Sequence, residues 1–346
     1  MLPYVVLYCV VYTLFFCNGI RRGDLFINAS VVCVFLFSSL RFMVGWDYAH
    51  YYDAIVYDVD NNVISRGEWL TVALIEISRN LKSPYIYFFV NALLLFVPLW
   101  WLLIRKSSNK WLSLIVFLSF PLFFLNSLSV VRMFSAIGIV LIAVDFLFRK
   151  KLFIYFALVL VAASLHKSAL LSLVFIVFLF FRPSRTLWSV LLIVSFFGGH
   201  VFAGILQGVT DWYNPIYSTY LERASIQEGT KAIYVFLAFV FVLFFVDYNN
   251  IKTDMRLSLY YNIYLFGVCV YLAFLDFGTA GHRLSLYGTI YLVILLPSFI
   301  RTFDGWSVKL GVHAGLHLFF IFLFFYTIQI GSETYIPYKT IFEDGL

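Results

Sequence analysis

Long runs of hydrophobic residues, separated by short polar segments, repeat along the whole chain. Most runs approach the roughly 20 residues that an α-helix needs to cross a bilayer. The pattern predicts helices near residues 2–19, 24–40, 84–104, 111–128, 132–148, 152–165, 168–181, 186–206, 232–247, 257–275, 284–300 and 310–328. We therefore expect an all-α, polytopic integral membrane protein with about 12 transmembrane helices.

Two stretches depart from the pattern of full-length spans. The runs 152–165 and 168–181 are short, and they predict a helical hairpin with His166 at its tip. Segment 68–82 alternates apolar and polar residues at helical spacing, which predicts an amphipathic helix on the outer face of the membrane. The opening run, residues 2–19, lacks a basic leading segment and is read as a first span and not as a signal peptide.

The remaining polar stretches are too short to form a soluble domain. They cover about residues 41–68, 207–231 and 329–346, and each is well below domain size. The sequence therefore predicts one transmembrane domain over residues 1–346, with these three stretches as loops on the outer face.

Charge sets the expected orientation of the chain. Only 12% of the residues are charged and 63% are hydrophobic. Loops that alternate along the predicted helices hold 14 of the 24 Lys and Arg but 5 of the 18 Asp and Glu, a net charge of +9. The opposite side has the other 10 Lys and Arg and 13 Asp and Glu, a net charge of −3. The net charges of the two sides sum to the +6 of the chain. By the positive-inside rule, the basic side is cytoplasmic.

A few polar residues stand at the ends of apolar runs, and this topology places them near the outer face: Arg41, Asp47, Arg132, His166, His282 and Arg283. An arginine within a bilayer costs about 2.5 to 3.5 kcal/mol at the centre and less near the surface, so it needs an anionic partner. Three kinds of anionic partner are possible: a ligand, a lipid headgroup that the arginine reaches by snorkelling, or an acidic side chain of the protein, such as Asp276 for Arg283.

The segment from Arg41 to Tyr52 combines a cation, a carboxylate and tyrosines. Tyr48 and Tyr51 could stack on sugar rings, and Asp47 could take a proton from an attacking hydroxyl if burial raises its pKa. The competing interpretation is an aromatic belt with an Arg41–Asp47 pair that anchors the end of a helix.

At the predicted hairpin tip, His166 is either a proton acceptor or a neutral donor to a phosphate, and Lys167 adds positive charge. His313 and His317 share a helix face, but no third ligand is evident, so we expect no metal site. We expect no cofactor and no nucleic-acid partner either.

A site rich in arginine with one or two bases suits glycosyl transfer from a lipid-linked sugar pyrophosphate. The leaving group then needs no proton, but its negative charge must be neutralised. Bidentate arginine provides that neutralisation. A glycosidase would need two facing carboxylates, and a pair of Asp47 and Glu68 would leave the arginines unexplained.

The order of these elements resembles the EpsG-like branch of the Wzy polysaccharide (O-antigen) polymerases. The resemblance covers residues 35 to the end: Arg41-x3-Gly45-x-Asp47-Tyr48-x2-Tyr51, then Glu68-Trp-Leu, Arg132 at the start of a helix, His166-Lys-Ser-Ala-Leu, and Arg283-x3-Tyr287 before a span ending in Pro297. It implies a fold like that of GT-C-type membrane glycosyltransferases. The sequence departs from the pattern at Met133, where such sequences often have Gln.

The resemblance implies a polymerase in the bacterial inner membrane, with its active site facing the periplasm. It would move a growing glycan from undecaprenyl pyrophosphate to the non-reducing end of a new lipid-linked repeat unit. Arg41, Arg132 and Arg283 would hold pyrophosphate, while Asp47 or His166 would activate the acceptor. Further contacts to pyrophosphate or sugar are expected from His282, Lys167, Tyr48, Tyr51 and Glu68. Expected partners are the lipid-linked oligosaccharide and polysaccharide, membrane lipids, a chain-length regulator protein and a flippase.

Three other classes of protein fit the sequence less well. A flippase for lipid-linked oligosaccharide would use the same cations, but it should also have charges along a path inside the spans, where the candidates Glu76, Asp145 and Asp247 lie near helix ends. An acyltransferase would need a cytoplasmic cofactor entrance. Rhomboid-type proteolysis would need a Gly-x-Ser partner for the histidine.

Overall fold

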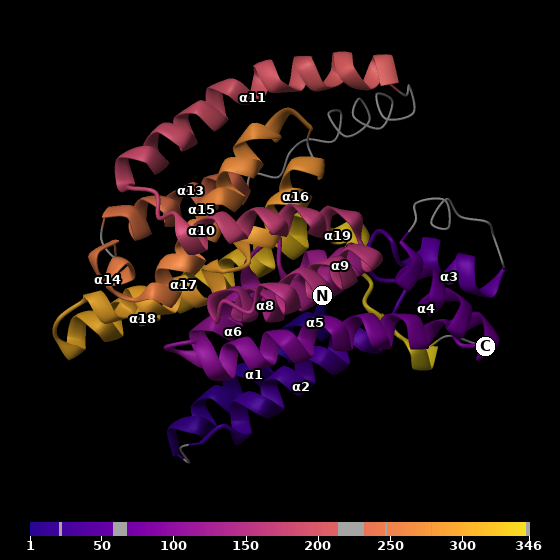
Figure 1. The fold of residues 1–346 in the computed structure, drawn as a ribbon. Helices are drawn as coiled ribbons and strands as arrows, with labels where there is room; N and C mark the ends of the chain where they lie inside the picture. Colours follow the sequence, from indigo (N-terminus) through magenta and orange to yellow (C-terminus); the bar gives the residue numbers. More distant parts are fainter. Residues whose placement is uncertain (21–22, 58–67, 214–231, 246–247, 278, 344–346) are drawn as a thin grey trace. The chain divides into compact units, whose positions relative to one another are not determined.

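The computed structural model describes residues 1–20, 23–57, 68–213, 232–245, 248–277 and 279–343. Those residues are almost wholly helical (Figure 1). Contacts between Cα atoms divide the chain into two compact units. The first comprises Met1–Leu170 and Gly305–Leu346, and the second, Leu171–Asp304, is inserted between them in the sequence.

The first unit holds most of the predicted site residues. Its α-helices are α1 (Leu2–Ile20), α2 (Leu25–Ser39), α3 (Tyr48–Val56), α4 (Trp69–Asn80), α5 (Pro84–Lys106), α6 (Lys110–Ser119), α7 (Phe124–Ser129), α8 (Val131–Phe148), α9 (Leu152–Leu165), α18 (Trp306–Ile330) and α19 (Ser332–Tyr335). A 3-10 helix, η2 (Lys167–Ile176), follows α9 and crosses the sequence boundary between the units. Another, η5 (Ile341–Glu343), ends the described chain.

Helix α8 forms the centre of this unit, packed between α5 and α9. Gly138 brings α8 against α5 so closely that an added Cβ atom would lie 2.0 Å from the Leu94 carbonyl oxygen. One turn earlier, the Ser135 hydroxyl donates to the Asn91 Oδ1 atom at 2.6 Å. Small residues and interhelical hydrogen bonds are the usual means of joining helices in a membrane. Of the most apolar window of α8, 78% is buried, against 22% in α1 and α18.

The chain's C-terminal segment returns to the loop that follows α2. Strand β1 (Arg41–Phe42) pairs antiparallel with β2 (Lys339–Thr340), with Arg41 opposite Thr340. Additional backbone bonds join Ile341 N–H to the Leu40 carbonyl and Gly45 N–H to the Thr334 carbonyl. The loop that leads to Asp47 is therefore fixed by residues about 300 positions later.

The second unit is built around α15 (Met255–Ala273), which contacts α11 (Arg185–Tyr213), α13 (Ala232–Phe245), α16 (Thr279–Thr289) and α17 (Leu292–Phe299). Shorter elements are α10 (Val177–Phe180), α14 (Tyr248–Thr253), η3 (Leu275–Phe277) and η4 (Ile300–Thr302). Gly267 and Gly288 face each other across α15 and α16, where a Cβ atom on Gly288 would lie 2.5 Å from the Ile263 carbonyl oxygen. Only glycine permits this approach.

The structure confirms most predicted helices, including the amphipathic segment 68–82 as α4, and it corrects four details. The run 111–128 is two helices, because Pro121 lies between α6 and α7. The run 284–300 bends by 53° between residues 289 and 292. The run 168–181 is mostly 3-10 helix, and the expected loop 41–68 contains α3.

Among the described residues, four helices are long and apolar enough to span a bilayer, or five if the bent pair in 281–302 counts as one span. The same residues include six further apolar helices of 10–17 residues. An all-α membrane-type protein is thus confirmed, whereas the number of about 12 spans and the GT-C-type arrangement stay predictions. So does the single transmembrane domain with its outer loops, since 58–67, 214–231 and 344–346 lie outside the described residues.

Candidate functional site

A buried ion pair between Arg132 and Glu68 lies at the centre of the candidate site. Arg132 is the second residue of α8, and its Nη1 atom donates to the Glu68 carboxylate, which directly precedes α4. Their side chains are 9% and 5% exposed. A cation in the first turn of a helix meets the positive end of the helix dipole, so Arg132 requires a negative group beside it.

Glu68 also connects these helices to the turn that follows α9. Its Oε1 atom accepts a hydrogen bond of 3.1 Å from the Lys167 backbone N–H. Close by, the Thr71 hydroxyl of α4 donates to the Leu165 carbonyl at 2.9 Å. Three predicted site residues, Glu68, Arg132 and Lys167, are therefore brought together, although Lys167 contributes its backbone and its side chain is exposed.

The tyrosines of α3 cover the Arg132 side of this pair. The Arg132 guanidinium carbon lies 5.4 Å from the centre of the Tyr51 ring, and that ring is 5.0 Å from Tyr87 of α5. Tyr48, one turn earlier, stacks on Phe88 at 3.8 Å. Both α3 tyrosines are almost fully buried. They form a wall of the site, where cation–π attraction to Tyr51 holds the guanidinium in place.

Asp47 immediately precedes α3 and is half-buried. Its charge reaches the same cluster: the pKa of Tyr51 is raised to about 12, chiefly by burial, while Arg132 lowers this pKa and Asp47 and Glu68 raise it. Two carboxylates, one guanidinium and one phenol thus interact electrostatically. Asp47, one of the two predicted bases, therefore acts by its charge on Tyr51, whose ring lies beside Arg132.

His166 ends α9 in an extended conformation, and its Nδ1 atom shares a hydrogen bond of 2.6 Å with the Ser168 hydroxyl. The half-buried ring directly precedes Lys167, whose backbone binds Glu68. His166 is therefore held by a local contact at the edge of the Arg132–Glu68 pair. Its expected role as a base stays a prediction.

Arg41 is buried and bonded entirely to backbone. Its guanidinium donates to the carbonyls of Ser38, Val44 and Leu128, the last two at 3.2 and 3.1 Å. The guanidinium carbon also lies 5.5 and 5.4 Å from the centres of the stacked rings of Tyr48 and Phe88. Burial lowers its pKa. A pyrophosphate could reach it only by replacing these carbonyls, so in this geometry Arg41 positions the 41–47 loop. Its expected part in binding pyrophosphate stays a prediction.

Gly45 explains how that loop approaches the turn before α8. Its φ is +102°, and an added Cβ atom would lie 2.1 Å from the Leu128 carbonyl oxygen. The neighbouring Trp46 N–H donates to the Ser129 hydroxyl at 3.2 Å. The loop that ends at Asp47 therefore packs closely against the residues that precede Arg132.

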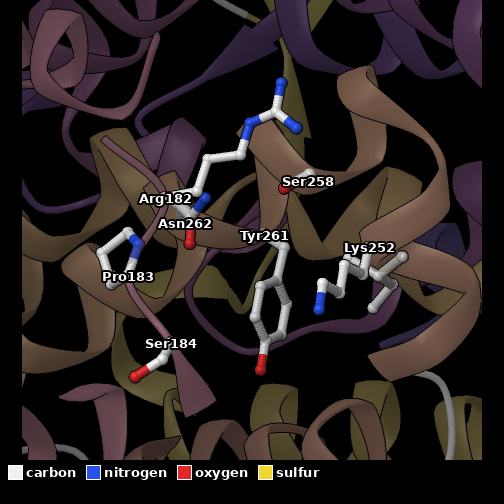
Figure 2. A pocket seen from close by; sticks show the side chains of 8 residues that line it. Arg182, Pro183, Ser184, Lys252, Ser258, Tyr261 and Asn262 are labelled. Carbon is white, nitrogen blue, oxygen red and sulfur yellow. The ribbon is translucent and has the colours of Figure 1, made fainter. Parts of the chain in front are cut away.

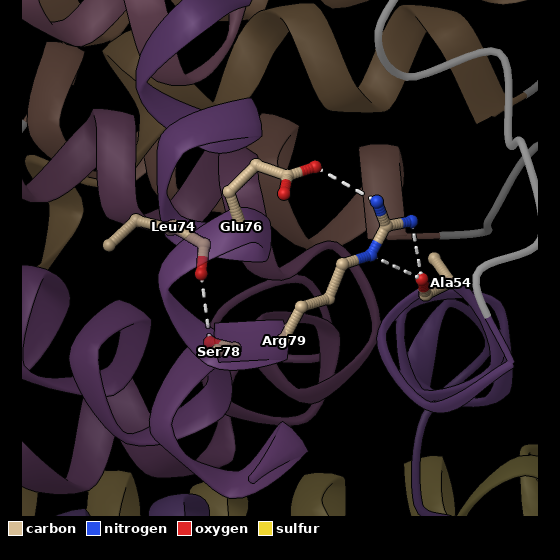
Figure 3. A network of polar contacts seen from close by, with 5 residues as sticks. All are labelled: Ala54, Leu74, Glu76, Ser78 and Arg79. Carbon is tan, nitrogen blue, oxygen red and sulfur yellow. Dashed lines mark hydrogen bonds and ion pairs between the residues drawn. The ribbon is translucent and has the colours of Figure 1, made fainter. Parts of the chain in front are cut away.

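A salt-bridged arginine joins α3 to α4 at their far ends. Figure 3 shows the Arg79 guanidinium of α4 reaching the Ala54 carbonyl in the last turn of α3, at 2.9 Å from Nε and 2.6 Å from Nη2. Its Nη1 atom also contacts Glu76 at 2.8 Å. Carbonyl groups at a helix C-terminus lack intrahelical donors, so this bond satisfies one of them.

Arg283 and His282 belong to α16 in the second unit. His282 is buried, Arg283 is half-buried, and neither the Nδ1 atom of His282 nor the Nε atom of Arg283 has a hydrogen-bond partner among the described residues. Gly281 lies against the Phe274 carbonyl, where a Cβ atom would come within 2.4 Å. The expectation that Arg283 joins Arg41 and Arg132 stays a prediction.

Reasoning from sequence missed several contributors to the site. Tyr87, Thr71 and Ser129 were not singled out, and α3 was expected to be loop. The helix had a detectable signal, since Tyr48, Tyr51, Tyr52 and Ile55 follow helical spacing and are its buried face. Among the described residues, no three His, Cys, Asp or Glu side chains gather around a possible metal position. Independence from metals and cofactors stays a prediction.

Comparison with known proteins adds one finding. The chain matches the model of a protein family described as the EpsG family over residues 24–340, nearly its whole length. No curated protein and no solved structure matches it.

Proposed function

The chain belongs to the EpsG family, and from that premise we propose that it is a polysaccharide polymerase of the Wzy type, a membrane glycosyltransferase. It transfers a growing glycan from undecaprenyl pyrophosphate to the non-reducing end of a new lipid-linked repeat unit. The reaction takes place at the periplasmic face of a bacterial inner membrane.

The observation that supports this proposal most is the buried Arg132–Glu68 pair beneath Tyr51, with Asp47 in electrostatic reach. A buried cation of this kind can exchange its carboxylate partner for a phosphate oxygen, because guanidinium binds both groups with the same geometry. Charged hydrogen bonds contribute about 1.5 to 3 kcal/mol each, enough to favour departure of a pyrophosphate. Arg283 would add a second cation.

The transfer needs one bond to break and one to form. The acceptor hydroxyl oxygen bonds to the anomeric carbon of the donor chain, and the bond from that carbon to the pyrophosphate oxygen breaks. The hydroxyl proton passes to Asp47 or His166, and undecaprenyl pyrophosphate leaves as an anion beside the arginines. The expected contacts of Tyr48 and Tyr51 with the sugars would require these almost fully buried rings to become exposed.

The direct test is incubation of the purified full-length protein with a synthetic polyprenyl-pyrophosphate repeat unit, scored for a ladder of products with and without chelator. Arg132→Ala alone leaves the buried Glu68 without its cationic partner, which costs about 3 to 5 kcal/mol. The informative variant is therefore Arg132→Met with Glu68→Met, which removes both charges and keeps the volume. We expect it to fold and to make no ladder.

An unchanged ladder from the folded double variant would contradict the proposal. In cells, the polymerase hypothesis predicts that single lipid-linked repeats accumulate in the outer leaflet of the variant. Trapping of the repeat on the cytoplasmic side would instead support a flippase. A ladder that disappears with chelator would show that the reaction depends on a metal.

A further inference from the structure

The second unit contains a pocket that the proposed reaction does not use. It encloses about 250 Å³ between the segment before α11, helix α14 and the first turns of α15 (Figure 2). Eight residues line it: Arg182, Pro183, Ser184, Ile251, Lys252, Ser258, Tyr261 and Asn262. All belong to the same compact unit, so the pocket is formed within it.

The charge of the pocket is positive. Arg182 and Lys252 are exposed, and neither forms an ion pair within the described parts of the chain. The nearest acid in sequence, Asp254, is engaged by the backbone N–H groups of Arg256 and Leu257 at 2.8 and 3.1 Å. Two cations therefore line one small cavity, and no carboxylate is among the described residues that line it.

The polar groups of the wall are suited to donate hydrogen bonds. Tyr261 lies between the Pro183–Ser184 segment and Lys252, and Figure 2 shows the Ser184 and Tyr261 hydroxyls at the same end of the pocket. The buried Asn262 already accepts a bond of 2.8 Å at Oδ1 from the Trp188 indole, so its amide NH₂ is the group left for a ligand. Cations, hydroxyls and an amide NH₂ together match an anion rich in oxygen.

The size of the pocket limits which ligands can fit into it. Pockets for complete small molecules usually measure about 300 to 1,000 Å³, so a cavity of about 250 Å³ suits a headgroup and not an oligosaccharide. Arg182 and Lys252 also belong to two of the basic loops that charge assigns to the cytoplasmic side. Anionic lipids give that leaflet its negative potential and attract basic groups near its surface.

We propose that this pocket binds a phosphate group, carried by an anionic phospholipid headgroup or present as free phosphate. Arg182 and Lys252 supply the charge, while Ser184, Ser258, Tyr261 and Asn262 supply neutral hydrogen bonds. The site is separate from the proposed transfer reaction and does not depend on it.

The test uses full-length protein in detergent micelles that contain phosphatidylglycerol and phosphatidylcholine, with retained lipid counted by native mass spectrometry. We expect wild type to retain phosphatidylglycerol and Arg182→Ala with Lys252→Ala to bind it at least about tenfold more weakly, the effect of losing one charged hydrogen bond. Both side chains are exposed, so this variant should fold. Tyr261→Phe, which removes only a hydroxyl, should weaken binding less.

Arg301→Ala is the matched control, because Arg301 is an exposed arginine of the same unit that does not line the pocket. Its binding should equal that of wild type. Binding of inorganic phosphate but not phosphatidylglycerol, lost in the double variant, would identify free phosphate as the ligand. Equal binding of both probes by wild type and the double variant, or an equal loss in Arg301→Ala, would overturn the proposal.

Discussion

At the scale of single residues, the main finding is that the arginines of the sequence motif have different environments. Arg132 faces a carboxylate that an anionic ligand can replace, whereas Arg41 is bonded to three backbone carbonyls. The Nε atom of Arg283 has no hydrogen-bond partner among the described residues. We therefore expect the same residue type to serve ligand binding at Arg132 and architecture at Arg41.

The identity of the base is a prediction at this scale. Asp47→Asn keeps the size of the side chain but removes its charge. We expect it to slow ladder formation about 100-fold or more, the usual contribution of a general base. His166→Gln, which keeps a polar side chain beside Ser168, should have a smaller effect.

Folding of both variants is checked by size-exclusion profile and thermal unfolding. The reverse order of effects would make His166 the base, and full activity in both would remove them from the mechanism. Tyr51→Phe tests the tyrosine hydroxyl alone in the same assay, because it retains the ring that lies beside Arg132.

The sequence alone could identify the charged members of the site but not their pairing. Arg132 and Glu68 are 64 positions apart, and nothing local in the chain indicates that they meet. The three carbonyls that hold Arg41 were equally hidden, because every residue carries a carbonyl and only the fold selects which ones a guanidinium reaches.

At the scale of elements, the long apolar runs were predictable because burial in lipid demands continuous hydrophobic helix. The exceptions have local causes. Pro121 cannot continue a helix, so α6 ends before it. Helix α3 was hidden by its tyrosines and by Asp47 and Asp53, which resemble the polar composition of a loop, although its spacing is helical.

Docking of α3 on α4 gives a prediction for this scale. Arg79→Ala removes two hydrogen bonds to the Ala54 carbonyl and should destabilise the α3–α4 contact by about 1.5 to 3 kcal/mol. Because α3 carries Tyr51 and follows Asp47, we expect activity to fall as well. Thermal unfolding and the ladder assay measure the two effects.

Glu76→Ala provides the control for Arg79→Ala. It breaks the exposed ion pair to Arg79 but leaves both bonds to Ala54, and pairs of this kind contribute about 0 to 1 kcal/mol. Its stability and activity should therefore stay close to wild type. Equal losses in the two variants would mean that the ion pair, and not the contact with α3, holds the helices together.

At the scale of the whole molecule, the asymmetry of charge predicts which loops face the cytoplasm. A protein with Cys9, Cys17, Cys33 and Cys269 replaced by alanine can carry one new cysteine at a time. Trp46→Cys, on the 72% exposed Trp46, should react with a membrane-impermeant maleimide in intact cells. Lys150→Cys and Arg301→Cys should react only after the inner membrane is permeabilised.

Labelling of Trp46→Cys only after permeabilisation would reverse the orientation and would place the loop beside Asp47 in the cytoplasm. The periplasmic reaction would then be excluded, whatever the ladder assay shows. Labelling of all three positions in intact cells would show that the apolar runs do not alternate as the charges indicate.

The pairing of β1 with β2 has a consequence for biosynthesis. A ribosome completes the Asp47 loop about 300 residues before the strand that secures this loop is made. The reaction centre can therefore be finished only after the entire inserted unit has been translated. Prematurely terminated chains would contain every proposed reacting group of the first unit and still lack a fixed loop to hold Asp47.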